Sequence, residues 1–133
     1  MKLTRASGYA LHAVAYMAAQ KQNRPIASHL IARARGIPER FLLKVLKPLV
    51  SARLLHSIKG PNGGYRLARA ATDISMLDVV EAVDGPIRGQ APLSQTQGDG
   101  ALDRRLETIC NQSAEQLRKY LHKVRLSELA SKS

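Results

Sequence analysis

The chain has 133 residues, of which 44% are hydrophobic and 23% are charged. This length allows one compact domain with its own core, and this composition argues against intrinsic disorder. No apolar run approaches the length of a membrane span, and the first residues lack the apolar stretch of an export signal, so we expect a cytoplasmic protein. The single cysteine excludes an intrachain disulfide and a multi-cysteine metal cage within one chain.

Positive charge is concentrated in the first half of the chain. Residues 1–71 carry 13 Lys and Arg against one acidic residue, Glu39, whereas residues 72–133 carry 8 against 9, within a net charge of +11. Such a basic half favours nucleic acid as the partner over a membrane surface. Aromatic residues make up only 4%, with no Trp, which argues against a platform that stacks single-stranded bases. We therefore expect double-stranded DNA as the partner, and no membrane.

Apolar residues at three- and four-residue spacing predict helices in the first part of the chain. A first helix is expected over about residues 4–20. A second is expected over about residues 28–35, with Leu30 and Ile31 facing inward and Gly36 as its left-handed stop. The tight turn at this glycine joins the second helix to a third, and the two helices form a helix-turn-helix.

A third helix follows directly, with Pro38 suited to its first helical position. Pro48 conflicts with this helix, because proline removes a backbone hydrogen bond, so we expect a kink or an end near Lys47. The apolar stripe that would face the core consists of Leu42, Val45, Leu46 and Leu49.

Residues 54–59 and 64–68 then read as two strands joined by a tip of turn formers, residues 60–63. Lys59 at this tip and Arg66 on the second strand add basic side chains to the hairpin, and both are candidates for DNA contact. A helix-turn-helix followed by a hairpin is the order of a winged helix-turn-helix. The predicted fold class is therefore mainly α with a small β-hairpin.

Two further helices are expected in the second half. Ser75, with Asp78 three residues on, predicts a capped helix that ends at Gly85. This helix closes a DNA-binding domain of residues 1–85, and residues 86–100 read as a loop or linker, rich in Gly, Pro, Gln and Ser.

Residues 101–133 are expected to form a dimerisation helix, reaching to about residue 125, and a C-terminal tail. A helix of this length on a small domain cannot bury its apolar seam within one chain, so pairing with a second copy is expected. The seam residues are Leu102, Leu106, Ile109, Ser113, Leu117, Tyr120 and Val124.

The third helix carries the strongest candidates for DNA contact. Arg40, Lys44 and Lys47 lie opposite its apolar stripe, where they are expected to contact DNA. The alternative is that they form an ordinary solvated charged face. Arg40 in the first turn is assigned to base readout, and the two lysines to phosphates. Lys59 at the hairpin tip is assigned to the minor groove; the alternative there is a simple turn.

The sequence contains no arrangement typical of an enzyme or a metal site. The four histidines form no HxxxH pattern, and no nucleophile stands beside a base. Cys110, near the helical seam, is expected to be a small buried hydrophobic residue, with a reactive thiol as the alternative.

Several stretches together resemble the Rrf family of bacterial winged helix-turn-helix transcriptional regulators. They are residues 3–5 (LTR), 8–11 (GYAL), 36–38 (GIP), 59–67 (KGPNGGYRL), 77–85 (LDVVEAVDG) and 126–129 (LSEL). The resemblance implies a dimer joined by the long helix and binding a palindromic promoter element. It also places certain residues at positions that contact DNA: Glu39, Arg40, Phe41 and Lys44 on the recognition helix, and Lys59 with Asn62 on the wing.

The resemblance does not extend to a cofactor. Members of the family that bind an iron-sulfur cluster carry three cysteines in the segment corresponding to residues 86–106, where this chain has none. We therefore expect a homodimeric DNA-binding regulator, most simply a repressor, without a cluster. Two alternatives remain: a thiol switch at Cys110, and control by an unidentified small-molecule or protein effector, as one branch of the family suggests.

Overall fold

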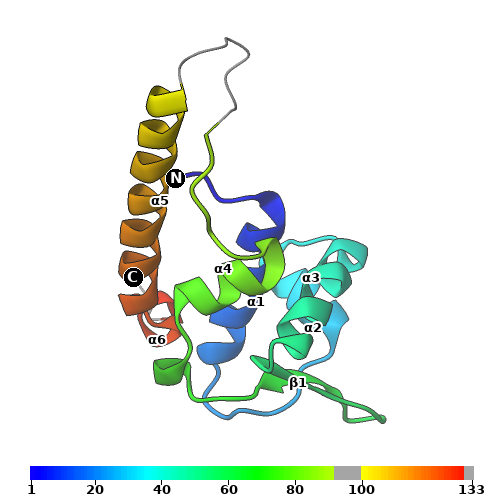
Figure 1. The fold of residues 1–133 in the computed structure, drawn as a ribbon. Helices are drawn as coiled ribbons and strands as arrows, with labels where there is room; N and C mark the ends of the chain where they lie inside the picture. The colour runs from blue at the N-terminus through cyan, green and yellow to red at the C-terminus, as the bar shows by residue number, and fades with distance from the viewer. Residues whose placement is uncertain (92–99, 131–133) are drawn as a thin grey trace.

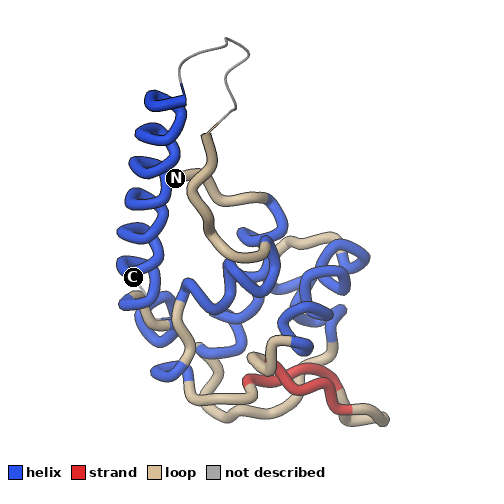
Figure 2. The backbone as a smooth tube through the Cα atoms, in the orientation of Figure 1, coloured by secondary structure: helices blue, strands red, loops and turns tan. Residues whose placement is uncertain are grey.

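Within residues 1–91 and 100–130, which the structure describes, a computed structural model shows helices and one β-hairpin (Figures 1 and 2). The hairpin lies at one corner of the molecule, and the longest helix stands on the opposite side. The predicted fold class is confirmed. None of the helices in this part of the chain is both long and apolar enough to cross a bilayer. In chain order the elements are α1 (Arg5–Ala18), α2 (Ser28–Arg35), α3 (Glu39–Ser51), β1 (Leu55–Ile58), β2 (Gly64–Leu67), the 3-10 helix η1 (Ala71–Asp73), α4 (Met76–Asp84), α5 (Gly100–Lys123) and α6 (Leu126–Ala130).

Local signals set the ends of the first two helices. The Thr4 hydroxyl oxygen accepts a hydrogen bond of 3.0 Å from the Ser7 backbone N–H, so Thr4 caps α1. Gly36 ends α2 with a φ of 65°, a left-handed conformation that glycine adopts without strain. Ile31 is buried as predicted, but Leu30 is 45% exposed, so only part of the expected inner face of α2 reaches the core.

α3 continues through Pro48, so of the two outcomes expected there the end near Lys47 is wrong, and the kink stays a prediction. The helix begins one residue later than expected, because Pro38 is its N-cap rather than its first helical residue. A proline inside a helix removes one backbone hydrogen bond. Leu46 and Leu49, on either side of it, are fully buried, and their packing holds this last turn in place.

The hydrophobic core lies where α1 packs against α3, α4 and α6. Leu126 of α6 is fully buried there, so the segment read from the sequence as a tail contributes to the same core as α1. Two backbone hydrogen bonds of 2.8 Å hold this end of the chain against the start of α4. The Met76 N–H donates to the Val124 carbonyl, and the Leu126 N–H donates to the Ile74 carbonyl.

The second half of the chain follows the predicted order with one shift. The Ser75 hydroxyl oxygen accepts from the Asp78 N–H at 3.0 Å, and the Asp78 carboxylate accepts from the Ser75 N–H at 2.9 Å, which completes the predicted capping box. α5 ends at Lys123, so Val124, predicted to lie on the helical seam, follows the helix instead. Of the predicted linker, residues 92–99 lie outside the described residues, as do residues 131–133 of the predicted tail.

Candidate nucleic-acid interface

The outer face of α3 is cationic. Arg40, Lys44 and Lys47 are all exposed, while the apolar stripe on the other side of the helix is buried. Glu39, the one acidic residue in the first 71, begins the helix, and its carboxylate accepts a hydrogen bond of 2.8 Å from the Ser28 hydroxyl of α2. The three cations predicted to contact DNA are therefore brought together on one accessible surface.

An aromatic ring lies beneath two of these cations. The Arg40 guanidinium carbon lies 4.8 Å from the centroid of the Phe41 ring, and the Lys44 ammonium nitrogen lies 5.9 Å from it. The ring of Tyr9 on α1 stacks against Phe41, with centroids 6.4 Å apart and planes 20° apart. A cation over a ring face is attracted by about 0.5–1 kcal/mol at an exposed site. Phe41 is half-buried, so its ring supports the two cations rather than projecting beside them.

The wing presents its predicted contact residues unequally. Lys59 and Asn62 are exposed in the turn at the tip, since β1 ends at Ile58, one residue earlier than predicted. Arg66 is half-buried on β2, opposite His56, and its Nε is buried without a hydrogen-bond partner among the described residues. The tip is therefore the accessible part of the wing, and Arg66 is partly covered.

Backbone contacts connect the wing to the chain between α1 and α2. Ile26 and Tyr65 exchange two hydrogen bonds of 2.9 Å, which adds a one-residue third strand to the sheet. A Cβ atom on Gly64, where φ is 143°, would collide with the backbone at Ile26, so this close approach requires glycine. These bonds hold the wing in one position relative to the helix-turn-helix.

Asn23 strengthens the same connection with its side chain. Its Nδ2 donates to the Leu67 carbonyl at 2.9 Å, and its Oδ1 accepts from the Leu67 N–H at 3.1 Å. Sequence reasoning missed this clamp because Asn23, two residues before Pro25, reads only as part of a break between helices. A side chain that pairs with the backbone 44 residues away leaves no local pattern in the sequence.

Five of the seven predicted seam residues are exposed: Leu102, Leu106, Ile109, Ser113 and Tyr120. Leu117 and Val124 are half-buried. Cys110, Ala114 and Leu121 lie on a neighbouring face of the helix that is turned toward the rest of the chain. The exposed fractions of the large seam side chains are 47% for Leu102, 40% for Leu106, 57% for Ile109 and 67% for Tyr120.

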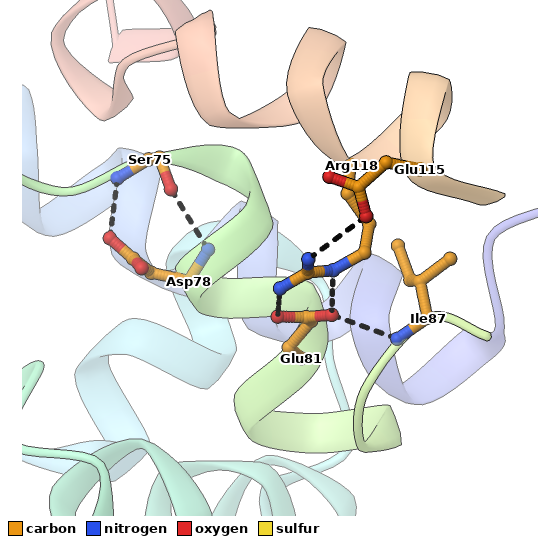
Figure 3. A network of polar contacts seen from close by, with 6 residues as sticks. All are labelled: Ser75, Asp78, Glu81, Ile87, Glu115 and Arg118. Carbon is orange, nitrogen blue, oxygen red and sulfur yellow. Dashed lines mark hydrogen bonds and ion pairs between the residues drawn. The ribbon is translucent and has the colours of Figure 1, made fainter. Parts of the chain in front are cut away.

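An ion pair joins α5 to α4 (Figure 3). Arg118 donates two hydrogen bonds to the Glu81 carboxylate, at 3.0 and 3.2 Å, and the Ile87 backbone N–H adds a third at 2.8 Å. The hydrogen bonds from Arg118 lower the pKa of the Glu81 carboxyl below its ordinary value of 4.5, against the opposing effect of burial. The pair therefore connects α4, the long helix α5 and the segment that follows α4.

The segment after α4 also crosses α5 closely. A Cβ atom on Gly89 would collide with the α5 backbone at Cys110, so glycine permits this crossing. Cys110 itself is half-buried, and a reactive role for its thiol stays a prediction. An open hollow of about 400 Å³ lies between residues 86–89 and α5, with Arg88 and Glu115 among its lining residues.

Comparisons with known proteins give a consistent result. The family model Rrf2, described as an iron-dependent transcriptional regulator, matches residues 3–132. The chain is 32% identical over 133 residues to the HTH-type transcriptional regulator IscR of Vibrio vulnificus, which covers 98% of this chain and 78% of IscR. It is 40% identical over 84 residues to protein aau3 of Rhizobium meliloti, which covers 63% of this chain and 54% of aau3. The chain thus spans about half the length of aau3.

Solved structures confirm the architecture. CymR, the global cysteine regulator of Bacillus subtilis, superposes with a TM-score of 0.76 at 24% identity, covering 98% of this chain and 96% of CymR. The oxidized form of Staphylococcus aureus CymR gives a TM-score of 0.75 at 23% identity, covering 100% and 98%. These likenesses show the fold, and the winged helix-turn-helix prediction is confirmed. The matching family model and IscR are both described as transcriptional regulators, so the expectation of a regulator rather than an enzyme is also confirmed.

The donor groups of this chain do not fit the iron that the family description implies. The sequence has one cysteine, whereas a cluster is held by several thiolates. No three His, Cys, Asp or Glu side chains come together as a metal site within residues 1–91 and 100–130. The only cysteine, Cys110, belongs to no such group among the described residues.

Proposed function

This chain belongs to the Rrf2 family of transcriptional regulators, and from that premise we propose that it is a homodimeric repressor of a palindromic promoter element. The observation that carries the proposal is the outer face of α3, where three exposed cations lie together. A cationic helix that follows a tight turn and precedes a hairpin suits the major groove of duplex DNA. Occupation of a promoter by such a dimer would block transcription.

The proposed contacts divide by chemistry. Arg40, in the first turn of α3, reads a base edge, because an arginine fork matches the two acceptors of guanine. Lys44 and Lys47, further along the same face, hold phosphates and set the orientation of the helix. Lys59 and Asn62 at the exposed wing tip reach the adjacent backbone or minor groove. The clamp between Asn23 and the wing keeps these two sets of contacts in register.

The proposed dimer uses the exposed stripe of α5. Seam positions recur every three or four residues, so they share one side of the helix, at an angle to the side that packs on α4. Apolar residues at this spacing are suited to a second copy of the same helix. A two-fold dimer presents its recognition helices symmetrically, which is the reason for expecting a palindromic site.

The dimer has its own test. Ile109→Glu places a charge on the most exposed aliphatic residue of the stripe and should yield monomers in sedimentation, with weaker binding to a palindrome. Thr108→Glu adds the same charge to an exposed position on another side of α5 and should leave the dimer intact. A dimer that survives Ile109→Glu unchanged would place the interface elsewhere.

We also propose that the chain acts without an iron-sulfur cluster, because its donor set does not fit one. The signal that releases the repressor is then an effector of another kind. The hollow between residues 86–89 and α5 adjoins the Glu81–Arg118 pair, and a ligand bound there would act on the connection between α4 and α5.

The experiment that tests DNA binding is selection of bound duplexes from a random pool, followed by titration at several salt concentrations. Lys44→Ala should weaken binding to all duplexes about equally and reduce the salt slope by roughly 0.9, the value for one lost phosphate contact. Lys119→Ala removes the same charge from an exposed position on α5 and should leave the slope unchanged. A protein that binds no duplex at low ionic strength would refute the proposed function.

A further inference from the structure

Leu43 is exposed on α3 without contributing to the core. Its side chain is 44% exposed, whereas the four members of the apolar stripe on the same helix are at most 5% exposed. It therefore lies outside the stripe, on the side of α3 that faces solvent. Single exposed leucines are common on protein surfaces, so the neighbours of Leu43 decide whether this one has a role.

The neighbours of Leu43 are the cations of the proposed interface. Arg40 precedes it by three positions and Lys47 follows it by four, and such positions are adjacent on a helix surface. Lys44 is the next residue and is also exposed. Leu43 is thus an apolar residue within the cationic surface that would face the phosphates and the major groove of duplex DNA.

The chemistry of the major groove offers one apolar group to such a side chain. Adenine, guanine and cytosine present hydrogen-bond donors and acceptors there, and thymine adds a C5-methyl group. A leucine pressed against a donor or acceptor would strip it of water without replacing the hydrogen bond, which is unfavourable. Against a methyl group, the same contact removes apolar surface from water on both sides.

We propose that Leu43 reads thymine by apolar contact with its C5-methyl group. The proposal rests on the proposed duplex-binding function and deepens it, because it assigns to α3 an apolar reader beside the polar one at Arg40. Arg40 and Leu43 are one turn apart, so the two residues would report on neighbouring base pairs.

The test replaces single thymines of the selected duplex with deoxyuridine, which removes only the methyl group. At a contacted thymine the wild-type protein should lose about fourfold in affinity, equal to about 0.8 kcal/mol for one methyl-sized group. Leu43→Ala should bind the thymine and deoxyuridine duplexes equally. Leu43→Gln, which keeps the length of the side chain but makes it polar, should also lose the discrimination.

Leu30→Ala is the matched control. Leu30 is 45% exposed on α2, so it is as accessible as Leu43, but it lies off the recognition helix, and its variant should discriminate like the wild type. A wild-type protein that binds its selected duplex but shows no sensitivity to deoxyuridine would overturn this inference and leave the proposed function standing. Discrimination that persists in Leu43→Ala would also overturn it, and failure to bind any duplex would refute both.

Discussion

Leu126→Ala should destabilise the whole protein, although Leu126 lies only seven positions before the last residue of the sequence. The side chain is fully buried in the core formed with α1. Truncation to alanine removes three carbon atoms, which costs about 2.4 kcal/mol at about 0.8 kcal/mol for each group returned to water. The cavity left behind adds to this cost, and since the five-residue α6 can partly relax, we expect about 3 kcal/mol in total.

Thermal unfolding followed by circular dichroism measures this effect, since the chain has no Trp to report by fluorescence. At the usual unfolding entropy per residue, about 3 kcal/mol corresponds to a decrease in Tm of about 10 °C. Protein concentration must be held constant, because the proposed dimer would make Tm depend on it.

Leu129→Ala provides the matched control for this prediction. Leu129 lies on the same short helix but is 40% exposed, so its truncation should change stability by at most about 0.5 kcal/mol. If Leu126→Ala had as small an effect as this control, α6 would not be part of the core in solution, and the reasoning would fail.

Three further changes test the interface and its supports. Arg40→Ala should relax discrimination by about 1–3 kcal/mol at one base pair, measured by competition between duplexes that differ there; unchanged preference would mean that Arg40 does not read a base. Asn23→Ala removes both hydrogen bonds to Leu67 and should cost about 1–3 kcal/mol in urea unfolding, with faster amide exchange on β2; unchanged exchange would show that the clamp does not hold the wing. Glu81→Gln should destabilise the protein at neutral pH. Because Arg118 lowers the pKa of Glu81, the stabilisation is present above 4.5 and lost as the pH falls through the lowered value, so the difference between wild type and variant should narrow in urea unfolding below pH 4.5. A gap that persists in acid would contradict this assignment.

Much of the fold could be predicted because its signals are local. Gly36 and the Ser75–Asp78 box act over three or four residues, so neighbouring residues along the chain contain all the information. Pro48 shows the limit of such signals. Its local preference to end the helix was overridden by burial of the leucines beside it, and burial depends on the rest of the fold.

Part of the candidate interface could likewise be predicted from the sequence, and part could not. The cations of α3 could be assigned to one exposed face from their spacing, because helical periodicity alone separates them from the apolar stripe. The Tyr9 ring behind Phe41 could not be assigned, since Tyr9 lies on a different helix. Leu43 falls outside the predicted stripe, but how much of its side chain is exposed depends on the rest of the fold.

From the sequence alone follow the helices and hairpin, the basic half, the family resemblance and the shortage of thiolates for a cluster. The docking of α6 and the clamp on the wing follow only from the folded chain, as does the division of α5 into a packed face and an exposed one. The physical reason is the separation along the chain between the residues that interact. Caps, turns and periodicity arise between near neighbours, whereas burial and side-chain pairing arise between segments that only the tertiary fold brings together.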